Sequence, residues 1–71
     1  MTITTESAHR EIIVTSGAHS IRHPINLELS NDANYEAAAK ALAAQVFPGS
    51  RLVRQRSAGW AIGRRSYLFE A

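Results

Sequence analysis

The 71-residue chain contains no cysteine, and it has little of several other residue types: one lysine, one tryptophan and two prolines. Without cysteine there is no disulfide, thiolate ligand or thiol nucleophile, which is typical of a protein from a reducing compartment. A chain this short buries only about 60 percent of the surface that it exposes when unfolded. We therefore expect a domain of low stability. Binding of a partner or of a second copy would stabilise its folded state by mass action.

Long apolar runs are also absent. No stretch approaches the ~20 residues of a membrane-spanning helix, and residues 1–7 lack the basic region and apolar core of a secretion signal. We expect a cytoplasmic protein with no membrane partner.

Charge is distributed unevenly along the chain, although the net charge is only +2. Residues 1–50 hold three basic and five acidic side chains, whereas residues 51–71 hold five arginines and one acidic residue, Glu70. The first part therefore carries −2 and the last part +4. Such segregation along a small chain predicts a basic surface formed by its C-terminal third.

The first part of the chain predicts an arm followed by two strands. Residues 1–10 are rich in Thr, Ser and charge without an apolar period, so we expect a flexible N-terminal arm, or at most an edge strand through Ile3, and a single domain at 11–71. The β-branched run at 11–16 predicts a strand. Residues 21–29 alternate between apolar and polar positions, which is typical of a half-buried strand, and Pro24 places that strand at an edge or a bulge.

The sequence from residue 30 onward predicts a helix. Ser-Asn-Asp at 30–32 offers good N-cap side chains, and Phe-Pro-Gly at 47–49 supplies a stop. Between them an apolar stripe recurs at spacings of three and four, and it consists of Tyr35, Ala38, Ala39, Leu42 and Val46. The small alanines favour close packing on a sheet, with Glu36 and Lys40 paired on the exposed side.

Residues 51–63 predict a β-hairpin with a two-residue turn at 58–59, which would place Gln55 opposite Ile62. In this register the helix-facing residues are Val53, Gln55, Trp60 and Ile62, and the outward-facing residues are Arg54, Arg56, Ala61 and Arg65. Residues 67–69 predict a last short strand, and the sequence leaves its facing open. The elements together predict an α+β fold, with an antiparallel sheet of four to five strands and one helix on one face, in the order strand, strand, helix, strand, strand, strand.

Side chains suited to catalysis or metal binding do not form a recognisable site. His19 and His23 would lie about 13 Å apart on the predicted strand, too far to share a metal ion. The four glycines do not form a phosphate-binding loop, and the serines lie in no recognisable nucleophile motif. We expect a non-enzymatic protein that uses no cofactor and no metal.

The arginine-rich C-terminal third is the candidate binding surface. Arginine presents a planar fork that fits carboxylate and phosphate groups, and it is enriched at protein interfaces. The candidate contact residues are Arg51, Arg54, Arg56, Arg64, Arg65 and Tyr67. The alternative is that these charges only keep the hairpin soluble and guard a sheet edge. Trp60 either packs beneath the helix, the commoner role for a tryptophan, or contacts the partner.

Four segments carry a resemblance to a known family: Leu-Glu-Leu-Ser at 27–30, the alanine-rich helix at 34–42, Phe-Pro-Gly-Ser-Arg-Leu at 47–52 and Gly-Trp-Ala-Ile at 59–62. Their order, a strand leading into an alanine-rich helix and a hairpin returning across it, resembles small phage-encoded anti-CRISPR proteins of type I systems. The resemblance implies a non-enzymatic inhibitor that docks on a CRISPR effector complex in the host bacterial cytoplasm and blocks DNA recognition or nuclease recruitment. It transfers no individual residue, so the arginine assignments depend on charge alone.

The sequence therefore predicts a small protein-binding inhibitor whose basic hairpin meets an acidic surface of a protein or ribonucleoprotein complex. One alternative is a nucleic-acid-binding module in which the same arginines contact phosphates. Another is a homodimer formed through an exposed strand edge.

Overall fold

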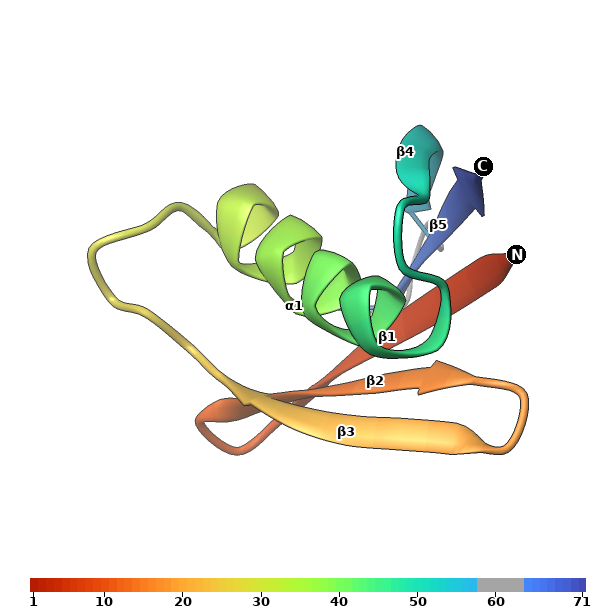
Figure 1. Ribbon diagram of the computed structural model, residues 1–71. Coiled ribbons are helices and arrows are strands. Elements are labelled where there is room, and N and C mark those ends of the chain that lie inside the picture. Colours follow the sequence, from red (N-terminus) through yellow and green to blue (C-terminus); the bar gives the residue numbers. More distant parts are fainter. Residues whose placement is uncertain (58–63) are drawn as a thin grey trace.

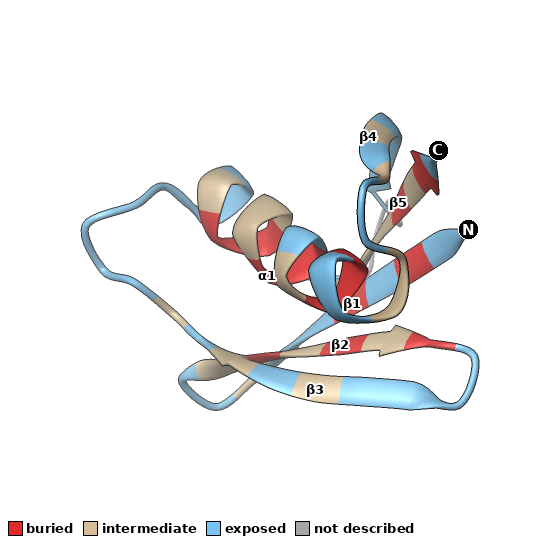
Figure 2. Cartoon of the chain, in the orientation of Figure 1, coloured by how far each residue is buried: buried red, intermediate tan, exposed pale blue. Residues whose placement is uncertain are grey.

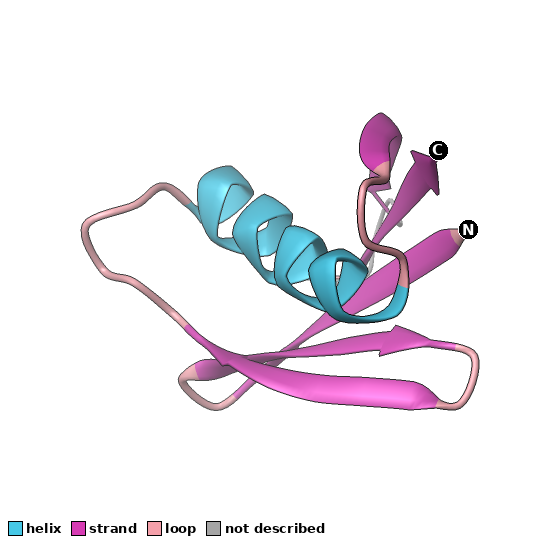
Figure 3. Cartoon of the chain, in the orientation of Figure 1, coloured by secondary structure: helices cyan, strands magenta, loops and turns pink. Residues whose placement is uncertain are grey.

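The computed structural model describes residues 1–57 and 64–71, which form one antiparallel sheet with a helix lying across one of its faces (Figure 1). In chain order the elements are β1 (Thr2–Ala8), β2 (Glu11–Ser16), β3 (His19–Pro24), α1 (Asn31–Val46), β4 (Arg51–Ser57) and β5 (Arg65–Glu70). The strand order is β3-β2-β1-β5-β4, so β3 and β4 are the edges of the sheet (Figure 3). The predicted α+β class, with an antiparallel sheet covered by a helix, is confirmed.

The prediction of a flexible arm at residues 1–10 is wrong, because residues 2–8 form β1, the central strand of the sheet. β1 pairs with β2 on one side and with β5 on the other, and the ammonium group of Met1 donates to the carbonyl of Phe69 at 2.8 Å. On the helix side of β1, Ile3 is 0% and Thr5 is 1% exposed. Two buried positions are too short an apolar pattern to reveal a strand without its neighbours, so the domain begins at residue 2 and not at residue 11.

The predicted strand at 11–16 is confirmed as β2, which buries alternate residues against the helix. Ile12 and Val14 are both fully buried, and Gly17 then makes the turn into β3 with a φ of 57°. Glycine adopts this conformation without the steric cost that a side chain would impose. Pro24 ends β3 at the sheet edge, as predicted, where a missing N–H disturbs the ladder least.

The predicted strand at 21–29 stops at Pro24, and the residues that follow form a loop rather than continuing the alternation. The buried side chain of Asn34 holds this loop: its Oδ1 accepts from the Asn26 amide at 2.8 Å, and its Nδ2 donates to three loop carbonyls. As a result Leu27 is 94% exposed and Leu29 is 44% exposed, so the expectation that both face the core is wrong. The path of this loop is set by hydrogen bonds from a helix residue, which no local sequence pattern indicates.

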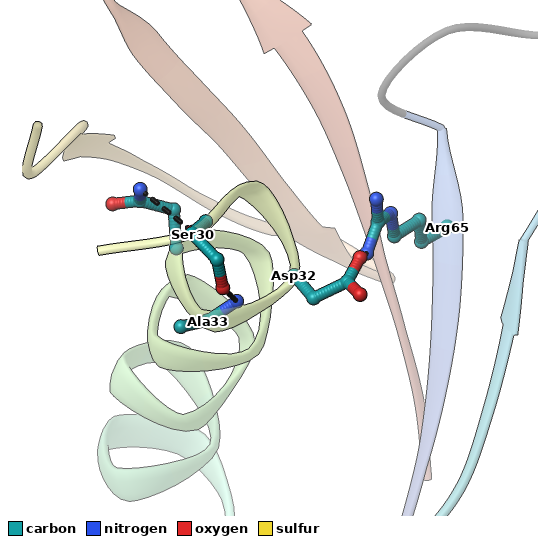
Figure 4. Close-up of polar contacts among 5 residues, drawn as sticks. Ser30, Asp32, Ala33 and Arg65 are labelled. Atoms are coloured by element: carbon teal, nitrogen blue, oxygen red, sulfur yellow. Dashed lines mark hydrogen bonds and ion pairs between the residues drawn. The ribbon is translucent and has the colours of Figure 1, made fainter.

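The predicted helix is confirmed over Asn31–Val46, and its termini follow the predicted signals. Ser30 is the N-cap, and its hydroxyl accepts from the Ala33 amide at 3.2 Å (Figure 4). At the other end the Phe47 amide donates to the Ala43 carbonyl at 2.8 Å, and Gly49 follows with a φ of 81°. Lys40 and Glu36 form the predicted pair at 3.3 Å. No helix in the described ranges is both long enough and apolar enough to cross a membrane.

The core lies between α1 and the sheet, and it reaches β4 only at Leu52, which packs against it (Figure 2). Its buried hydrophobic members are Ile3, Ile12, Val14, Tyr35, Ala38, Ala39, Leu42, Ala43, Tyr67 and Phe69. Ala38 and Ala39 are fully buried, so the helix backbone approaches the sheet closely, as the alanine stripe predicts. On β4 only Leu52 is half-buried, and the other six residues are exposed. β4 is therefore an edge strand that the helix leaves largely in solvent.

Candidate binding surface

The facing of the arginines follows from the register of β4 and β5, in which Gln55 pairs with Tyr67 and Ser57 pairs with Arg65. The predicted pairing of Gln55 with Ile62 involves a residue outside the described ranges. This register brings β5 beside β4 and buries Tyr67 and Phe69, two large aromatic side chains, in the core. The predicted turn at 58–59 and the predicted strand through Trp60 and Ile62 lie outside the described residues.

A β-bulge at Val53 sets which side of the sheet each arginine faces. In a regular strand Leu52, Arg54 and Arg56 would share one face. Instead Leu52 pairs with buried Phe69, whereas Arg54 pairs with Leu68 and Arg56 with Ser66. Val53 is the extra residue that shifts the phase. Because residues paired directly across strands share a face, both arginines point away from the helix, as predicted.

The face of the sheet opposite the helix carries no described helix and forms an open surface (Figure 1). At its β4 side Arg54 and Arg56 border a shallow hollow of about 160 Å³. The other residues that line this hollow are Thr2, Ser66 and Leu68. We define the arginine face as Arg51, Arg54 and Arg56 together with Thr2, Ser66 and Leu68. Two guanidinium groups and two hydroxyls supply hydrogen-bond donors for the oxygens of a carboxylate or a phosphate.

Arg54 and Arg56 provide the uncompensated charge of the arginine face. Both are exposed, and neither forms an ion pair with a carboxylate of the described residues. Arg51 lies on the same side of the sheet, directly across from Glu70 on β5, which offsets part of its charge. The positive potential is therefore strongest around Arg54 and Arg56.

Arg64 lies on the same face of the sheet but is already paired. Its Nη2 donates to Glu6 Oε1 at 3.3 Å, and both side chains are more than half exposed. Together with Ile13 and three threonines, this pair lines a second shallow hollow of about 300 Å³. The acidic partner comes from β1, the segment that the sequence predicted to be an arm. Arg64 therefore adds little net charge to the arginine face.

Arg65 lies on the helix side of the sheet, so its predicted place beside Arg54 and Arg56 is wrong. Its guanidinium is 4.6 Å from the centroid of the Tyr35 ring, and it donates to Asp32 in the first turn of α1 (Figure 4). The side chain is only 16% exposed. Burial acts to lower the pKa of Arg65, but the hydrogen bond and negative charge of Asp32 outweigh it and raise that pKa. Arg65 ties β5 to the helix and does not face a partner.

Tyr67 was predicted to contact the partner, but it is fully buried and cannot do so. It lies on the helix side of β5 opposite Ile3 of β1, while Leu68 takes the outward position. Burial raises the pKa of the Tyr67 hydroxyl above its ordinary value of 10.0. That hydroxyl has no hydrogen-bond partner among the described residues. The sequence left the facing of 67–69 open, because either parity is compatible with an alternation of aromatic and aliphatic residues.

The sequence also did not identify Thr2, Ser66 and Leu68 as members of this surface. Thr2 was missed because residues 1–10 were interpreted as an arm, and the alternation of exposed Thr2 and Thr4 with buried Ile3 is too short to indicate a strand by itself. Ser66 and Leu68 were missed because the bulge at Val53 sets their partners. A bulge has no sequence signature at this position.

Within the described residues there is no group of three or more histidine or acidic side chains placed to hold a metal ion. Comparison with protein-family models, with curated proteins and with solved structures found no match.

Proposed function

We propose that the chain is a small non-enzymatic inhibitor that binds an acidic surface of a protein or ribonucleoprotein complex through the arginine face. The observation that carries this proposal is the position of Arg54 and Arg56, exposed on one side of an edge strand and unpaired within the described residues. Arg64 and Arg65 form ion pairs with carboxylates of the same chain. The lack of a carboxylate beside Arg54 and Arg56 is therefore not explained by a general shortage of acidic residues.

The arrangement favours association because the groups that meet the partner are held in place before binding. Thr2, Ser66 and Leu68 belong to paired strands of the sheet, so little backbone entropy is lost when they are covered. Each guanidinium can donate two parallel hydrogen bonds to the two oxygens of one carboxylate. A standard interface covers about 800 Å² per partner, about one sixth of this chain's accessible surface of 4769 Å², so one sheet face is enough.

The partner class that we propose is a type I CRISPR effector complex in a bacterial host. The support for it is the resemblance in element order to phage-encoded anti-CRISPR proteins. A chain of this size bound to an acidic or nucleic-acid-guiding surface of such a complex would act by occupying it, and no chemical step is required.

The test is affinity capture from host cells with three tagged proteins: wild type, the Arg54→Glu/Arg56→Glu double variant, and Arg22→Glu. Arg22 is a matched control because it is an exposed arginine on the same face of the sheet but on the opposite edge strand, β3. We expect wild type and Arg22→Glu to capture the same complex and the double variant to lose it while still unfolding cooperatively. Equal capture by a folded double variant would contradict the proposal.

A nucleic-acid-binding module is the second candidate, because the hydroxyls of Thr2 and Ser66 beside two guanidinium groups also suit phosphate oxygens. A titration of the purified protein with duplex DNA at several salt concentrations separates the two functions. A phosphate binder using the three arginines of this face should bind unrelated duplex DNA by itself, with a log-log salt slope near −2.7. A protein-binding inhibitor should leave free DNA unbound.

A further inference from the structure

The outer side of β4 is a free strand edge. In the described part of the sheet, β4 is hydrogen-bonded to β5 on one side and has no strand on the other. Six of its seven residues are exposed, and α1 lies over the other strands, away from β4 (Figures 1 and 2). The backbone N–H and C=O groups that point outward from an edge strand are a ready template for another extended chain.

A second copy of this chain is a poor occupant of that edge. An antiparallel pair of β4 strands centred on Arg54 or Gln55 would bring the arginines of one copy against those of the other on the same face. Like charges placed directly across a strand pair are destabilising. The charges on β4 therefore oppose the homodimer that an uncharged edge would permit.

A neutral strand is also a poor occupant, because charged side chains and the bulge at Val53 are both devices that protect an edge. The bulge leaves a regular edge only over residues 54–57, so backbone pairing alone would be short. Pairing over so few residues must gain most of its affinity from side chains. Carboxylates would turn the repulsive charges of Arg54 and Arg56 into attractive ones.

We propose that the free edge of β4 accepts an extended acidic segment of a partner protein as a sixth strand, with acidic residues at every second position. Neighbouring strands lie about 4.8 Å apart and alternate residues share a face, so two carboxylates two residues apart would lie beside Arg54 and Arg56. This inference rests on the proposed function and makes it more specific, because it names the conformation and the charge pattern of the segment that binds.

The test uses blocked fluorescent peptides of seven residues, the length of β4, and measures their binding by anisotropy. Both peptides contain two glutamates among threonines: in the first, the alternating peptide, one threonine separates the glutamates, and in the second the glutamates are adjacent. The alternating peptide should bind about fivefold more tightly or better, because only it places carboxylates at the spacing of the two arginines.

Backbone pairing is tested with two methylated forms of the alternating peptide. Amide groups of an added strand point alternately toward and away from its neighbour, so methylating one alternate set of nitrogens removes the pairing and methylating the other leaves it. One methylated peptide should lose about tenfold in affinity and the other should keep it. Equal binding of both methylated forms, whether strong or weak, would overturn edge pairing.

The protein arm of the test reverses the charges. Arg54→Glu/Arg56→Glu should lose the glutamate peptide and gain an alternating lysine and threonine peptide, whereas Arg22→Glu should behave as wild type. If all peptides bind equally, or none binds, while the capture experiment still depends on Arg54 and Arg56, the edge inference fails and the proposed function remains. If capture does not depend on these arginines either, both fail.

Discussion

At the scale of single residues, four of the five arginines of the C-terminal third divide into two groups with different roles. Arg64 and Arg65 pair with Glu6 and Asp32, and Arg65 also lies over the Tyr35 ring. Arg54 and Arg56 are exposed and have no carboxylate partner among the described residues. Residue type does not separate the groups, because the distinction depends on which side of the sheet each side chain faces.

Tyr67 gives a prediction at the same scale, because its buried hydroxyl has no hydrogen-bond partner in the described part of the chain. Tyr67→Phe removes that polar atom and keeps the ring, so stability near pH 7 should be unchanged or higher by up to about 1 kcal/mol. Urea unfolding followed by circular dichroism measures the difference. A loss of more than about 1 kcal/mol would show that the hydroxyl makes a stabilising bond.

The same variant should change how stability depends on high pH. The folded-state pKa of Tyr67 is raised above the ordinary value of 10.0, so the unfolded tyrosine loses its proton first as the pH rises. This tyrosine's contribution is fully present below about pH 10 and is lost as the pH rises through the raised folded pKa. Between about pH 8 and about pH 11, Tyr67→Phe should therefore lose less stability than wild type. Parallel losses would contradict the burial argument.

At the scale of elements, local signals predicted the helix and long-range contacts set the rest. Ser30, the alanine stripe and the Phe-Pro-Gly run at 47–49 act within a few residues of their positions, so the helix could be located from sequence. The central position of β1 depends on β2 and β5, and the loop after Pro24 depends on Asn34. No pattern within either segment reports those partners.

The candidate surface was likewise predicted in part, because strand pairing sets which side of the sheet some of its residues face. The outward facing of Arg54 and Arg56 was predicted, but Arg65 was assigned to the wrong side of the sheet, and Tyr67, whose facing the sequence left open, was wrongly included among the contact residues. Arg65 begins β5 and pairs with Ser57, which places it on the helix side of the sheet together with Tyr67. A register is decided by total burial across two strands, which a single strand's alternation does not specify.

The bulge at Val53 leads to a prediction about a deletion. Deleting one residue from a regular strand turns every later side chain to the other face. Here Val53 is the extra residue, so its deletion should give a regular strand with Leu52 still inward and Arg54 and Arg56 still outward. We expect the shortened protein to fold with stability within about 1 kcal/mol of wild type and to keep its partner, as measured by urea unfolding and capture. Loss of partner binding in a stable deletion variant would contradict the assigned facing.

At the scale of the whole molecule, the two parts of the chain partly neutralise each other. The −2 of residues 1–50 includes Glu6 and Asp32, and these two carboxylates pair with two of the five C-terminal arginines. The remaining excess of positive charge lies on one edge strand beyond the cover of the helix (Figure 2). Charge segregation along the sequence thus becomes a smaller and more local basic surface than the count of arginines suggests.

Amide hydrogen exchange of the protein, measured alone and with its captured partner, tests the location of the binding surface most directly. The account predicts that slowed exchange on binding is concentrated in β4, residues 51–57, while β3 at the opposite edge and the exposed side of α1 exchange as in the free protein. Protection centred on β3 or on the helix, with β4 unchanged, would contradict it.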